Sequence, residues 1–528
     1  MTRTISRAGA IGLSMFWALA AQAEVKLPPV FSDHAVLQRG MAVPVWGTAA
    51  AGEKVTVKFR GQEKTATAGP DGAWRIKLDA LEAGGPDELT VAGTNTLTLK
   101  DVLVGDVWLG SGQSNMGGSG KGYSAKDPVL AKNIAAGPYP KLRLITPKSG
   151  WKEATPANLE GFSAIHFSFG LPLQKETNVP IGLLYGAVGG TPSGDWLTAA
   201  MFDADAGVKA VVAKGMESYK PDEEKARYEK AKAAYEKQLA ELPKAEPGKP
   251  APKKPNAPTA YGPPGTMNNG GKPGRLFEQH LRGYVGYAMK GVLWDQGESG
   301  TAVRGVDQYT LMGALIRGWR NEWGQGDFAF IYVQKPSGGG PAWDPASPVT
   351  DQASKFVPMP MTGPAKEVNT ANGGASRELH TRIVAYPNTF MATSSDLGAG
   401  IHPTNKSGYG ARAARVALGA VYGQKVEYYG PVFDKLTVEG DAARATFSHT
   451  GQGLATPAGQ PLQGFAIAGE DKQFYWATAT IDGDAVVLKA KEVTKPVAVR
   501  YAWAATFPWA NLFNKDGLPA QAFRTDAW

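Results

Sequence analysis

The sequence predicts an α/β domain with a buried parallel sheet and β-rich regions on both sides of it. Two nearly continuous apolar runs, 102–109 and 181–188, have the length and composition of strands that are covered on both faces. Outside the α/β part, short runs alternate apolar and polar residues between Gly, Pro and Asp turns. The chain has 528 residues, with 66 glycines and 38 prolines, so we expect several domains that are rich in strands and turns.

Three domains follow from this pattern. Residues 24–104 carry period-two runs with turns about every 8–12 residues, which is typical of a small β-sandwich. Residues 105–427 form the α/β domain, in which the segments 291–294 and 328–333 continue the apolar strand pattern. The alternating pattern returns near 428, so 428–528 is predicted as a C-terminal β-rich domain that adds to the sandwich structure.

Residues 215–275 interrupt the α/β pattern. The segment 222–242 is rich in Ala, Glu and Lys, with acids near its start, which favours a helix and complements its dipole. The Pro- and Lys-rich tract that follows, 243–264, is expected to be extended and mobile. We interpret the whole segment as a solvated helical insertion with a flexible return. An arm that gates substrate access is the alternative.

The first 23 residues have the features of a secretory signal peptide. Arg3 and Arg7 supply a positive start, 8–19 an apolar run, and 21–23 a small-residue cleavage site. A membrane anchor is the alternative, but the apolar run is shorter than the roughly 20 residues of a span, and no other stretch has the length to cross a bilayer. We therefore expect a periplasmic or secreted bacterial protein without a membrane span.

Charge and cysteine content narrow the class of protein. The net charge of +8 falls to +6 once Arg3 and Arg7 are removed, and no basic–aromatic motif accompanies the lysines, so nucleic acid is not an expected partner. The chain has no cysteine, which excludes disulfides and cysteine-ligated zinc. Its six histidines lack the two-histidine helical spacing of a zinc enzyme, so no metal is expected.

A serine and a histidine are candidates for acyl-transfer chemistry. Ser114 follows an apolar strand and Gly112, so its hydroxyl can be exposed at a sheet edge where N–H groups stabilise an oxyanion. A turn or N-cap serine is the alternative, and the absence of a Gly-x-Ser-x-Gly elbow argues against an ordinary α/β-hydrolase. His402 precedes a predicted helix over 406–418, and an imidazole suits proton transfer near neutral pH. Asp396 lies six residues earlier, where it can orient that imidazole as a third triad member does.

Two further segments follow predicted strands. Gly189 and Gly190 let backbone N–H groups approach a ligand closely, although a tight turn between strand and helix uses the same residues. Gln296 carries a side-chain amide that can donate to an oxyanion or satisfy the loop backbone.

These segments together resemble the sialate O-acetylesterase-like family of SGNH/GDSL carbohydrate esterases. The resemblance extends in order over nearly the whole chain outside the first 23 residues and the insertion. The segments that carry it are 30–39, 105–116 (Gly-Asp-Val-Trp-Leu-Gly-Ser-Gly-Gln-Ser-Asn-Met), 189–192 with Trp196, 294–299 (Trp-Asp-Gln-Gly-Glu-Ser), 377–378, 396–398, 401–403 (Ile-His-Pro), 500–503, 511–513, 518–520 and 523–524.

The resemblance implies a flavodoxin-like, three-layer α/β/α SGNH-hydrolase fold and a cofactor-free serine esterase that acts on O-acetylated glycans. Ser114 would be the nucleophile and His402 the general base and then acid. The expected oxyanion hole consists of Ser114, Gly189, Gly190 and Gln296. The residues expected to contact substrate are Asn115, Trp196 and Glu298. The rings of Trp196, Trp294 and Trp343 suit stacking on a sugar, and core packing is the alternative for all three.

Two departures from the family pattern raise other readings. Gly400 stands where the family often has an aspartate, so either Asp396 orients His402 or the histidine works in a dyad helped by a backbone carbonyl. Gly300 replaces an asparagine of the third segment, which predicts altered specificity. Both glycines motivate the alternative of a non-catalytic glycan-binding protein on an esterase scaffold, whereas the lack of a long apolar lid argues against a lipase.

Overall fold

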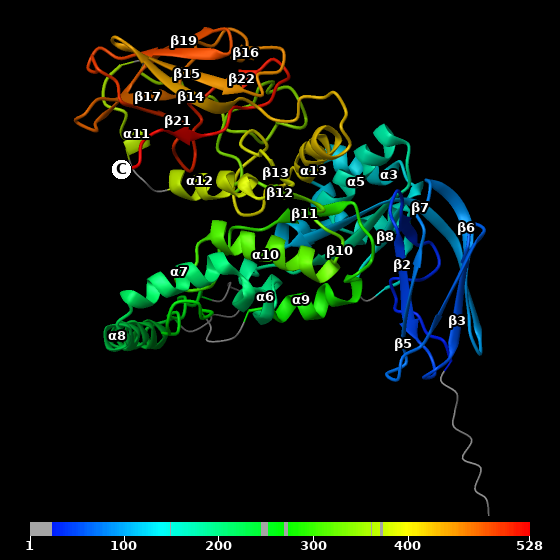
Figure 1. Cartoon of the computed structure of the whole chain (residues 1–528). Helices are drawn as coiled ribbons and strands as arrows, with labels where there is room; N and C mark the ends of the chain where they lie inside the picture. The colour runs from blue at the N-terminus through cyan, green and yellow to red at the C-terminus, as the bar shows by residue number, and fades with distance from the viewer. Residues whose placement is uncertain (1–23, 148, 244–251, 269–272, 361, 370–372) are drawn as a thin grey trace, which may run out of the picture.

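The computed structural model describes residues 24–147, 149–243, 252–268, 273–360, 362–369 and 373–528. The expected signal peptide lies outside these residues. Figure 1 shows an N-terminal β part and a C-terminal β part on opposite sides of a central α/β part. The predicted fold class, a mixed α/β protein with additional antiparallel sheets, is confirmed.

The central sheet is parallel except at one edge. Its strands β7, β10 and β11 lie in the middle and pair in parallel, and the short β9 pairs antiparallel with β8 at the edge. The apolar runs 102–109 and 181–188 fall in β7 and β10, as predicted. The strands in spatial order are β13 (Thr389–Ala392), β12 (Ala329–Val333), β11 (Gly291–Asp295), β7 (Thr96–Gly112), β10 (Ile181–Ala187), β8 (Tyr139–Ile145) and β9 (Lys152–Ala154).

Helices cover both faces of this sheet, because both faces of its strands are apolar. In β11, Val292 and Trp294 belong to one hydrophobic cluster and Leu293 to the other. This alternation explains why the strand reads as a continuous apolar run rather than as a period-two pattern. On the Leu293 face lie α3 (Pro128–Ala135), α4 (Pro156–Gly161), α5 (Ala164–Thr177) and α13 (Lys406–Val416), and on the other face α6 (Ala199–Ala204), α9 (Arg275–His280) and α10 (Gln308–Trp323).

The N-terminal part shares a strand with the central sheet. The first half of β7 pairs with β6 and its middle with β1, whereas its second half pairs with β10 and β11. The expected boundary between 104 and 105 therefore falls inside one continuous strand of 17 residues. The other N-terminal strands are β1 (Val36–Gln38), β2 (Val43–Thr48), β3 (Lys54–Phe59), β4 (Gln62–Thr67), β5 (Ala73–Leu78) and β6 (Gly84–Ala92).

The C-terminal part contains two four-stranded antiparallel sheets around one apolar core. Phe447 and Phe465, from opposite sheets, meet edge to face in that core with ring centroids 6.5 Å apart. The first sheet consists of β14 (Val432–Glu439), β15 (Ala442–Ser448), β20 (Ala485–Lys489) and β19 (Thr478–Asp482), and the second of β18 (Phe474–Trp476), β17 (Phe465–Ala468), β21 (Ala498–Tyr501) and β23 (Phe523–Arg524). The long connection from β12 to β13 carries α11 (Lys366–Asn369) and α12 (Gly374–Arg382) against this part.

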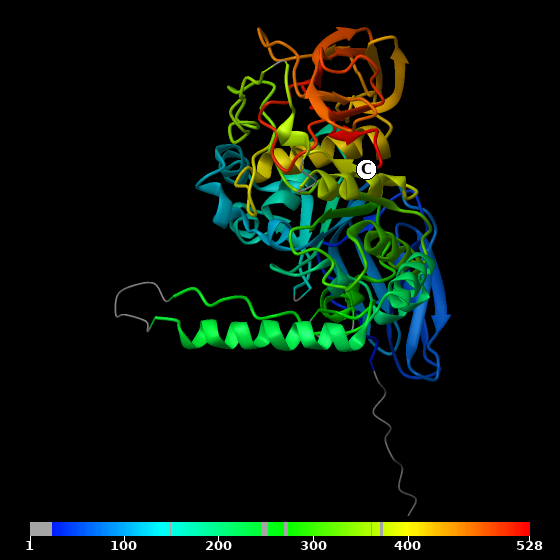
Figure 2. The same ribbon diagram turned by 90° about the vertical axis from the view of Figure 1, so that its left-hand side faces the viewer.

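The insertion is a projecting helical arm. Helix α7 (Ala206–Glu217) leads into α8 (Pro221–Ala240), which has no buried residue and extends away from the body of the molecule (Figure 2). The returning chain lies against the helix, since the rings of Tyr228 and Tyr261 are 5.5 Å apart. None of the helices in the described part of the chain is both long and apolar enough to span a bilayer.

Candidate active site

Ser114, Gly189 and Gln296 follow three neighbouring strands at the point where the sheet order reverses. β7 is the first strand of the parallel set, and the chain builds outward from it on one side with β10 and β8 and on the other with β11, β12 and β13. The carboxyl ends of strands that flank such a reversal form a crevice, which is the usual ligand site of open α/β sheets. Residue type and topology therefore indicate the same place.

The backbone before Ser114 presents the serine at this edge. Gly112 has φ of 131°, and a Cβ at this position would lie 2.2 Å from the carbonyl oxygen of Asp295. Only glycine allows β7 to end so close to β11. The N–H of Gln113 donates to the same oxygen at 2.9 Å, and Ser114 then opens the short helix α1 (Ser114–Gly117).

The structure brings Ser114 and His402 into direct contact. The Nε2 atom of His402 lies 2.8 Å from Ser114 Oγ, although the two residues are 288 positions apart in sequence. His402 is exposed and Ser114 is half-buried. With the lone pair on Nε2 the serine hydroxyl donates to the ring, which is the geometry of a nucleophile beside its general base.

The turn after β10 lies close to Ser114. A Cβ on Gly189 would lie 3.5 Å from the Cβ of Ser114, so the turn after β10 packs directly against the serine. Neither the N–H of Ser114 nor that of Gly189 donates a hydrogen bond to any residue that the structure describes. Gly190 follows with φ of 73°, and nothing lies within 4 Å of the position that its Cβ would take. The N–H groups of Ser114 and Gly189 are thus candidates for oxyanion donors.

The side chain of Gln296 is engaged by the protein itself. Its Nε2 donates to the carbonyl oxygens of Gly300 at 2.9 Å and Thr191 at 3.5 Å, and its Oε1 accepts from Gln308 at 3.3 Å. Gln296 is fully buried. In this geometry the amide joins the loops after β10 and β11. This matches the alternative in which Gln296 satisfies the loop backbone, and not the one in which it donates to an oxyanion.

Asp396 does not reach the histidine in this structure. Both of its carboxylate oxygens accept from Arg412, at 3.1 and 2.8 Å, and the pair is buried. Among the residues that the structure describes, no hydrogen bond joins Asp396 to His402. The expected orienting role is thus replaced here by an ion pair, because Arg412 on α13 takes up the carboxylate.

Asn115 ties the histidine loop to the nucleophile loop. Its Nδ2 donates to the carbonyl oxygen of Ile401 at 3.1 Å and to Glu298 at 2.7 Å, and its Oδ1 accepts from Lys406 at 2.6 Å. The residue after Ser114 thereby holds the residue before His402. Asn115 was expected to contact substrate, but its polar atoms are occupied by these protein partners.

Next to Asn115 lies a group of buried and half-buried charges, which we call the ionic cluster: Asp295, Glu298, Lys335 and Lys406. The Nζ atom of Lys335 lies 2.7 Å from Asp295 Oδ1 and 2.7 Å from Glu298 Oε1. Glu298 also accepts from the side chains of Gln113 and Asn115. Glu298 was predicted to bind substrate; in this structure both of its carboxylate oxygens contact protein side chains.

Burial and mutual charge shift the pKa values of the cluster in opposite directions. Burial raises the pKa of Asp295 above its usual range, although the charge of Lys335 opposes the shift. Burial also acts to raise the pKa of Glu298, but the charge and hydrogen bonds of Lys335 outweigh it and lower that pKa. Burial lowers the pKa of Lys406 to about 7, despite nearby carboxylates. Its ammonium also lies 4.5 Å from the ring centroid of Tyr123.

Two of the three tryptophans considered for sugar stacking, Trp196 and Trp294, are in the core. Trp196 is fully buried, its ring meets Trp294 edge to face at 6.1 Å, and its Nε1 donates to Thr191 at 3.1 Å. The prediction that Trp196 stacks on a sugar is therefore wrong, because the helices on this face of the sheet cover it. Trp343 differs, since it is partly exposed.

One group of potential metal ligands lies away from this site, at the N-terminal part. It consists of His34, Asp101 and Glu153. Arg143 already pairs with both carboxylates, at 2.8 Å from Asp101 and 3.8 Å from Glu153, and His34 Nδ1 lies 2.6 Å from Asp101. The guanidinium supplies the positive charge that a metal ion would bring.

The chain is similar to carbohydrate esterases over most of its length. Residues 104–244 match the model of the family described as carbohydrate esterase, sialic acid-specific acetylesterase. A sialate O-acetylesterase of Rattus norvegicus is 33% identical over 31% of this chain and 36% of its own. The sialate O-acetylesterase of Mus musculus is 27% identical over 90% of this chain and 88% of its own.

A solved structure extends this similarity to the whole fold. The crystal structure of a carbohydrate acetylesterase from Xanthomonas citri has a TM-score of 0.71 and 30% identity, and the match covers 96% of this chain and 100% of that one. Sequence and fold agree in the class of reaction that they indicate. The chain belongs to the sialate O-acetylesterase-like family of carbohydrate esterases and is a carboxylic-ester hydrolase.

Proposed function

We propose that this chain removes O-acetyl groups from sialic acid or a related acetylated glycan through a serine acyl-enzyme. The observation that carries the proposal is the 2.8 Å contact between Ser114 Oγ and His402 Nε2 at the carboxyl edge of the sheet. Family membership supplies the class of substrate. The relatives that the chain matches are a carbohydrate acetylesterase and sialate O-acetylesterases.

In the first step Ser114 Oγ attacks the carbonyl carbon of the acetyl group while His402 Nε2 takes the hydroxyl proton. The carbonyl oxygen becomes an oxyanion, and we assign the N–H groups of Ser114 and Gly189 as its hydrogen-bond donors. When the tetrahedral intermediate collapses, the bond to the sugar oxygen breaks and His402 returns the proton to that oxygen. The deacetylated sugar leaves, and the acetyl group remains on Ser114.

In the second step water replaces the sugar. His402 takes a proton from the water as its oxygen attacks the acetyl carbon, and the same donors hold the second oxyanion. Collapse breaks the bond to Ser114 Oγ, which regains its proton from His402, and acetate leaves. Every proton is transferred by the one imidazole, so the cycle uses no group beyond these side chains, backbone donors and water.

We also propose that the enzyme is exported. The support is the sequence pattern of residues 1–23, with Arg3 and Arg7 before an apolar run. Intact mass of the protein recovered from a bacterial periplasm tests this proposal. Loss of the first 23 residues is expected, whereas full-length protein confined to the cytoplasm would refute it.

The mechanism is tested by acetate release from 4-nitrophenyl acetate, O-acetylated sialic acid and acetylated xylan. Ser114→Ala is expected to abolish turnover on all three, and Ser124→Ala, a change ten residues away, is expected to retain it. Acetylated serine should be trapped on Ser114 and detected by mass spectrometry. Undiminished turnover in Ser114→Ala would exclude the serine mechanism. A folded wild type that binds the glycans without turnover would favour the non-catalytic reading.

A further inference from the structure

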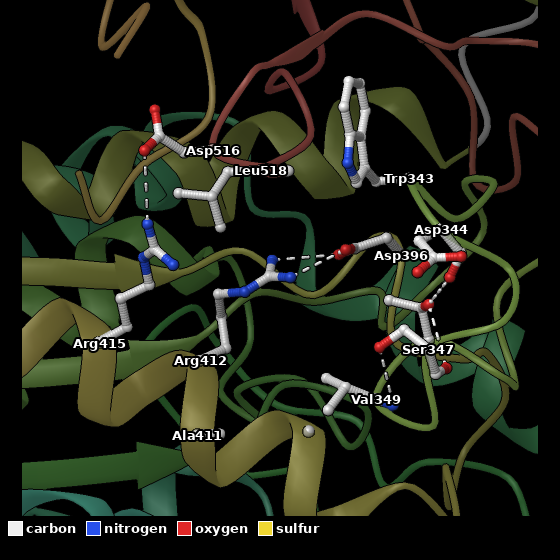
Figure 3. Close-up of a pocket in the computed structure, with 13 residues that line it drawn as sticks. Trp343, Asp344, Ser347, Val349, Asp396, Ala411, Arg412, Arg415, Asp516 and Leu518 are labelled. Carbon is white, nitrogen blue, oxygen red and sulfur yellow. Dashed lines mark hydrogen bonds and ion pairs between the residues drawn. The ribbon is translucent and has the colours of Figure 1, made fainter. Parts of the chain in front are cut away.

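A cavity lies where α13 meets the C-terminal part (Figure 3). Its volume is about 440 Å³, which is within the range of small-molecule sites, and such sites are frequent where two domains meet. It does not include Ser114 or His402. The lining residues that matter for recognition are Trp343, Asp344, Arg412, Arg415, Asp516 and Leu518.

The charges that line this cavity nearly cancel. Arg412 is held in its bidentate pair with Asp396, whereas Arg415 Nη2 lies 3.9 Å from Asp516 Oδ1, too far for a hydrogen bond. The side chain of Arg415 is 37% exposed, and Asp344 is exposed at the rim. Donors and acceptors thus stand side by side without a dominant charge. This favours a neutral ligand whose hydroxyls both donate and accept.

Trp343 supplies an aromatic surface beside these polar groups. Its ring centroid lies 5.5 Å from that of Phe513, which supports the indole from the C-terminal part. Gly517 has φ of 78°, and a Cβ there would lie 3.1 Å from the indole, so the glycine lets the loop pack against the ring. Leu518 adds apolar surface. A flat ring next to paired carboxylate and guanidinium groups suits the alternating apolar faces and hydroxyl edges of a pyranose.

The cavity wall is continuous with the loop that carries His402. Asn405 caps α13 by accepting from the N–H of Gly408 at 2.8 Å, and its Nδ2 donates to the carbonyl oxygens of Val349 and of Leu397. Gly408 and Val349 both line the cavity. A sugar bound there therefore lies against the structure that positions the general base.

We propose that this cavity is a subsite for a neutral sugar residue of the substrate glycan, separate from the acetylated residue at Ser114. The inference rests on the proposed function, which it deepens by assigning an oligomeric or polymeric glycan as the preferred substrate. The enzyme then binds a glycan chain at two places: one sugar residue carries the acetyl group that reacts at Ser114, and another stacks on the ring of Trp343.

Binding is measured by calorimetry in the inactive Ser114→Ala background, with xylohexaose and cellohexaose as neutral probes and a sialic acid hexamer as the anionic probe. At least one neutral hexasaccharide is expected to bind, and Trp343→Ala is expected to weaken it by about tenfold. Ala411→Phe, which fills the cavity without removing an existing contact, is expected to weaken it as well. Trp528→Ala, which removes an exposed tryptophan elsewhere, is the matched control.

The subsite is overturned if neither neutral probe binds, if only the sialic acid hexamer binds, or if binding is equal in Trp343→Ala and Trp528→Ala. Kinetics in the active protein separate this failure from failure of the proposed function. The ratio of kcat/KM on acetylated xylan to that on 4-nitrophenyl acetate should fall about tenfold in Trp343→Ala. If Trp343→Ala loses the same factor in kcat/KM on both esters, Trp343 has a structural role. If the wild type does not hydrolyse 4-nitrophenyl acetate, the esterase mechanism itself is refuted.

Discussion

The contact between Ser114 and His402 and the ionic cluster are linked through Asn115 but differ in environment. His402 is exposed and its contact with Ser114 is open to solvent, whereas Asp295 and Lys335 are almost entirely inaccessible. The contact joins the two side chains that we propose for the chemistry, and the cluster contains four ionisable groups, of which the Glu298 side chain is 16% exposed.

The contrast teaches how the histidine is held without an aspartate beside it. The cluster reaches the surface through Asn115, whose amide binds the carbonyl oxygen of Ile401 and the carboxylate of Glu298. Position is thus transmitted through backbone and amide contacts instead of a carboxylate on the imidazole. Buried ionic groups gain this rigidity at a desolvation cost, which only close pairing offsets.

Removing the general base should have the largest effect. His402→Ala is expected to lower kcat on 4-nitrophenyl acetate by on the order of 10⁴-fold, because no other described side chain is hydrogen-bonded to Ser114 Oγ. The melting temperature should change little, since the side chain is exposed. His449→Ala, in the C-terminal part, is the control and should retain activity. A loss below about tenfold would show that another group takes the serine proton.

Breaking the ionic cluster should lower the free energy of unfolding. Lys335→Met leaves Asp295 and Glu298 without their cation, and unpaired buried charges cost about 3–5 kcal/mol. Urea denaturation measures the loss. Neutralising the carboxylates as well, in Lys335→Met/Asp295→Asn/Glu298→Gln, should recover part of it. A loss below about 1 kcal/mol, as for an exposed pair, would remove the distinction between the two regions.

Lys406 should make stability depend on pH. Its pKa of about 7 in the folded protein is below the unfolded value near 10.4, so the unfolded chain binds more protons between these values. The free energy of unfolding of the wild type relative to Lys406→Met should therefore rise with pH from about 7 to about 10, by at most about 1.4 kcal/mol per unit. Denaturation at several pH values measures this difference, and a flat difference would contradict it.

The smallest effect is expected at the aspartate that the sequence suggested. Asp396→Asn should leave kcat/KM on 4-nitrophenyl acetate within about threefold of wild type, because Asp396 pairs with Arg412. An aspartate that orients a triad histidine is worth about 10⁴-fold in kcat. A loss of that size in a variant that is still folded at the assay temperature would return Asp396 to the catalytic machinery.

The sheet was predictable because its strands are apolar on both faces, but the end of the N-terminal domain was not. The pattern of β7 changes near 102 from alternating to continuously apolar, and this change resembles a boundary. In the structure the strand continues. What changes there is its surroundings, from a sheet with one exposed face to a sheet covered on both faces.

The contact between Ser114 and His402 could be expected from the sequence, because the chemistry that we propose restricts the residue types that can perform it. The ionic cluster was not, because lysine is a residue of the surface in most proteins and its burial depends on partners far away in sequence. Lys335 follows β12 and Lys406 opens α13, so both stand at the ends of elements that meet the active edge. That placement is the one signal that the sequence offered. The prediction that Trp196 contacts substrate failed because a sequence does not show which side of a loop faces the core.

The continuity of β7 makes the N-terminal part a fixed extension of the nucleophile's own strand. A continuous strand without a hinge does not let the two parts rotate against each other. Strand β1 pairs with the middle of β7 and adds hydrogen bonds where the two parts meet. Truncation at 104 would cut hydrogen-bonded backbone in the centre of the sheet instead of a linker. The two parts should consequently unfold together in one calorimetric transition. A chimera that carries the N-terminal part of a relative would have to be joined within β7.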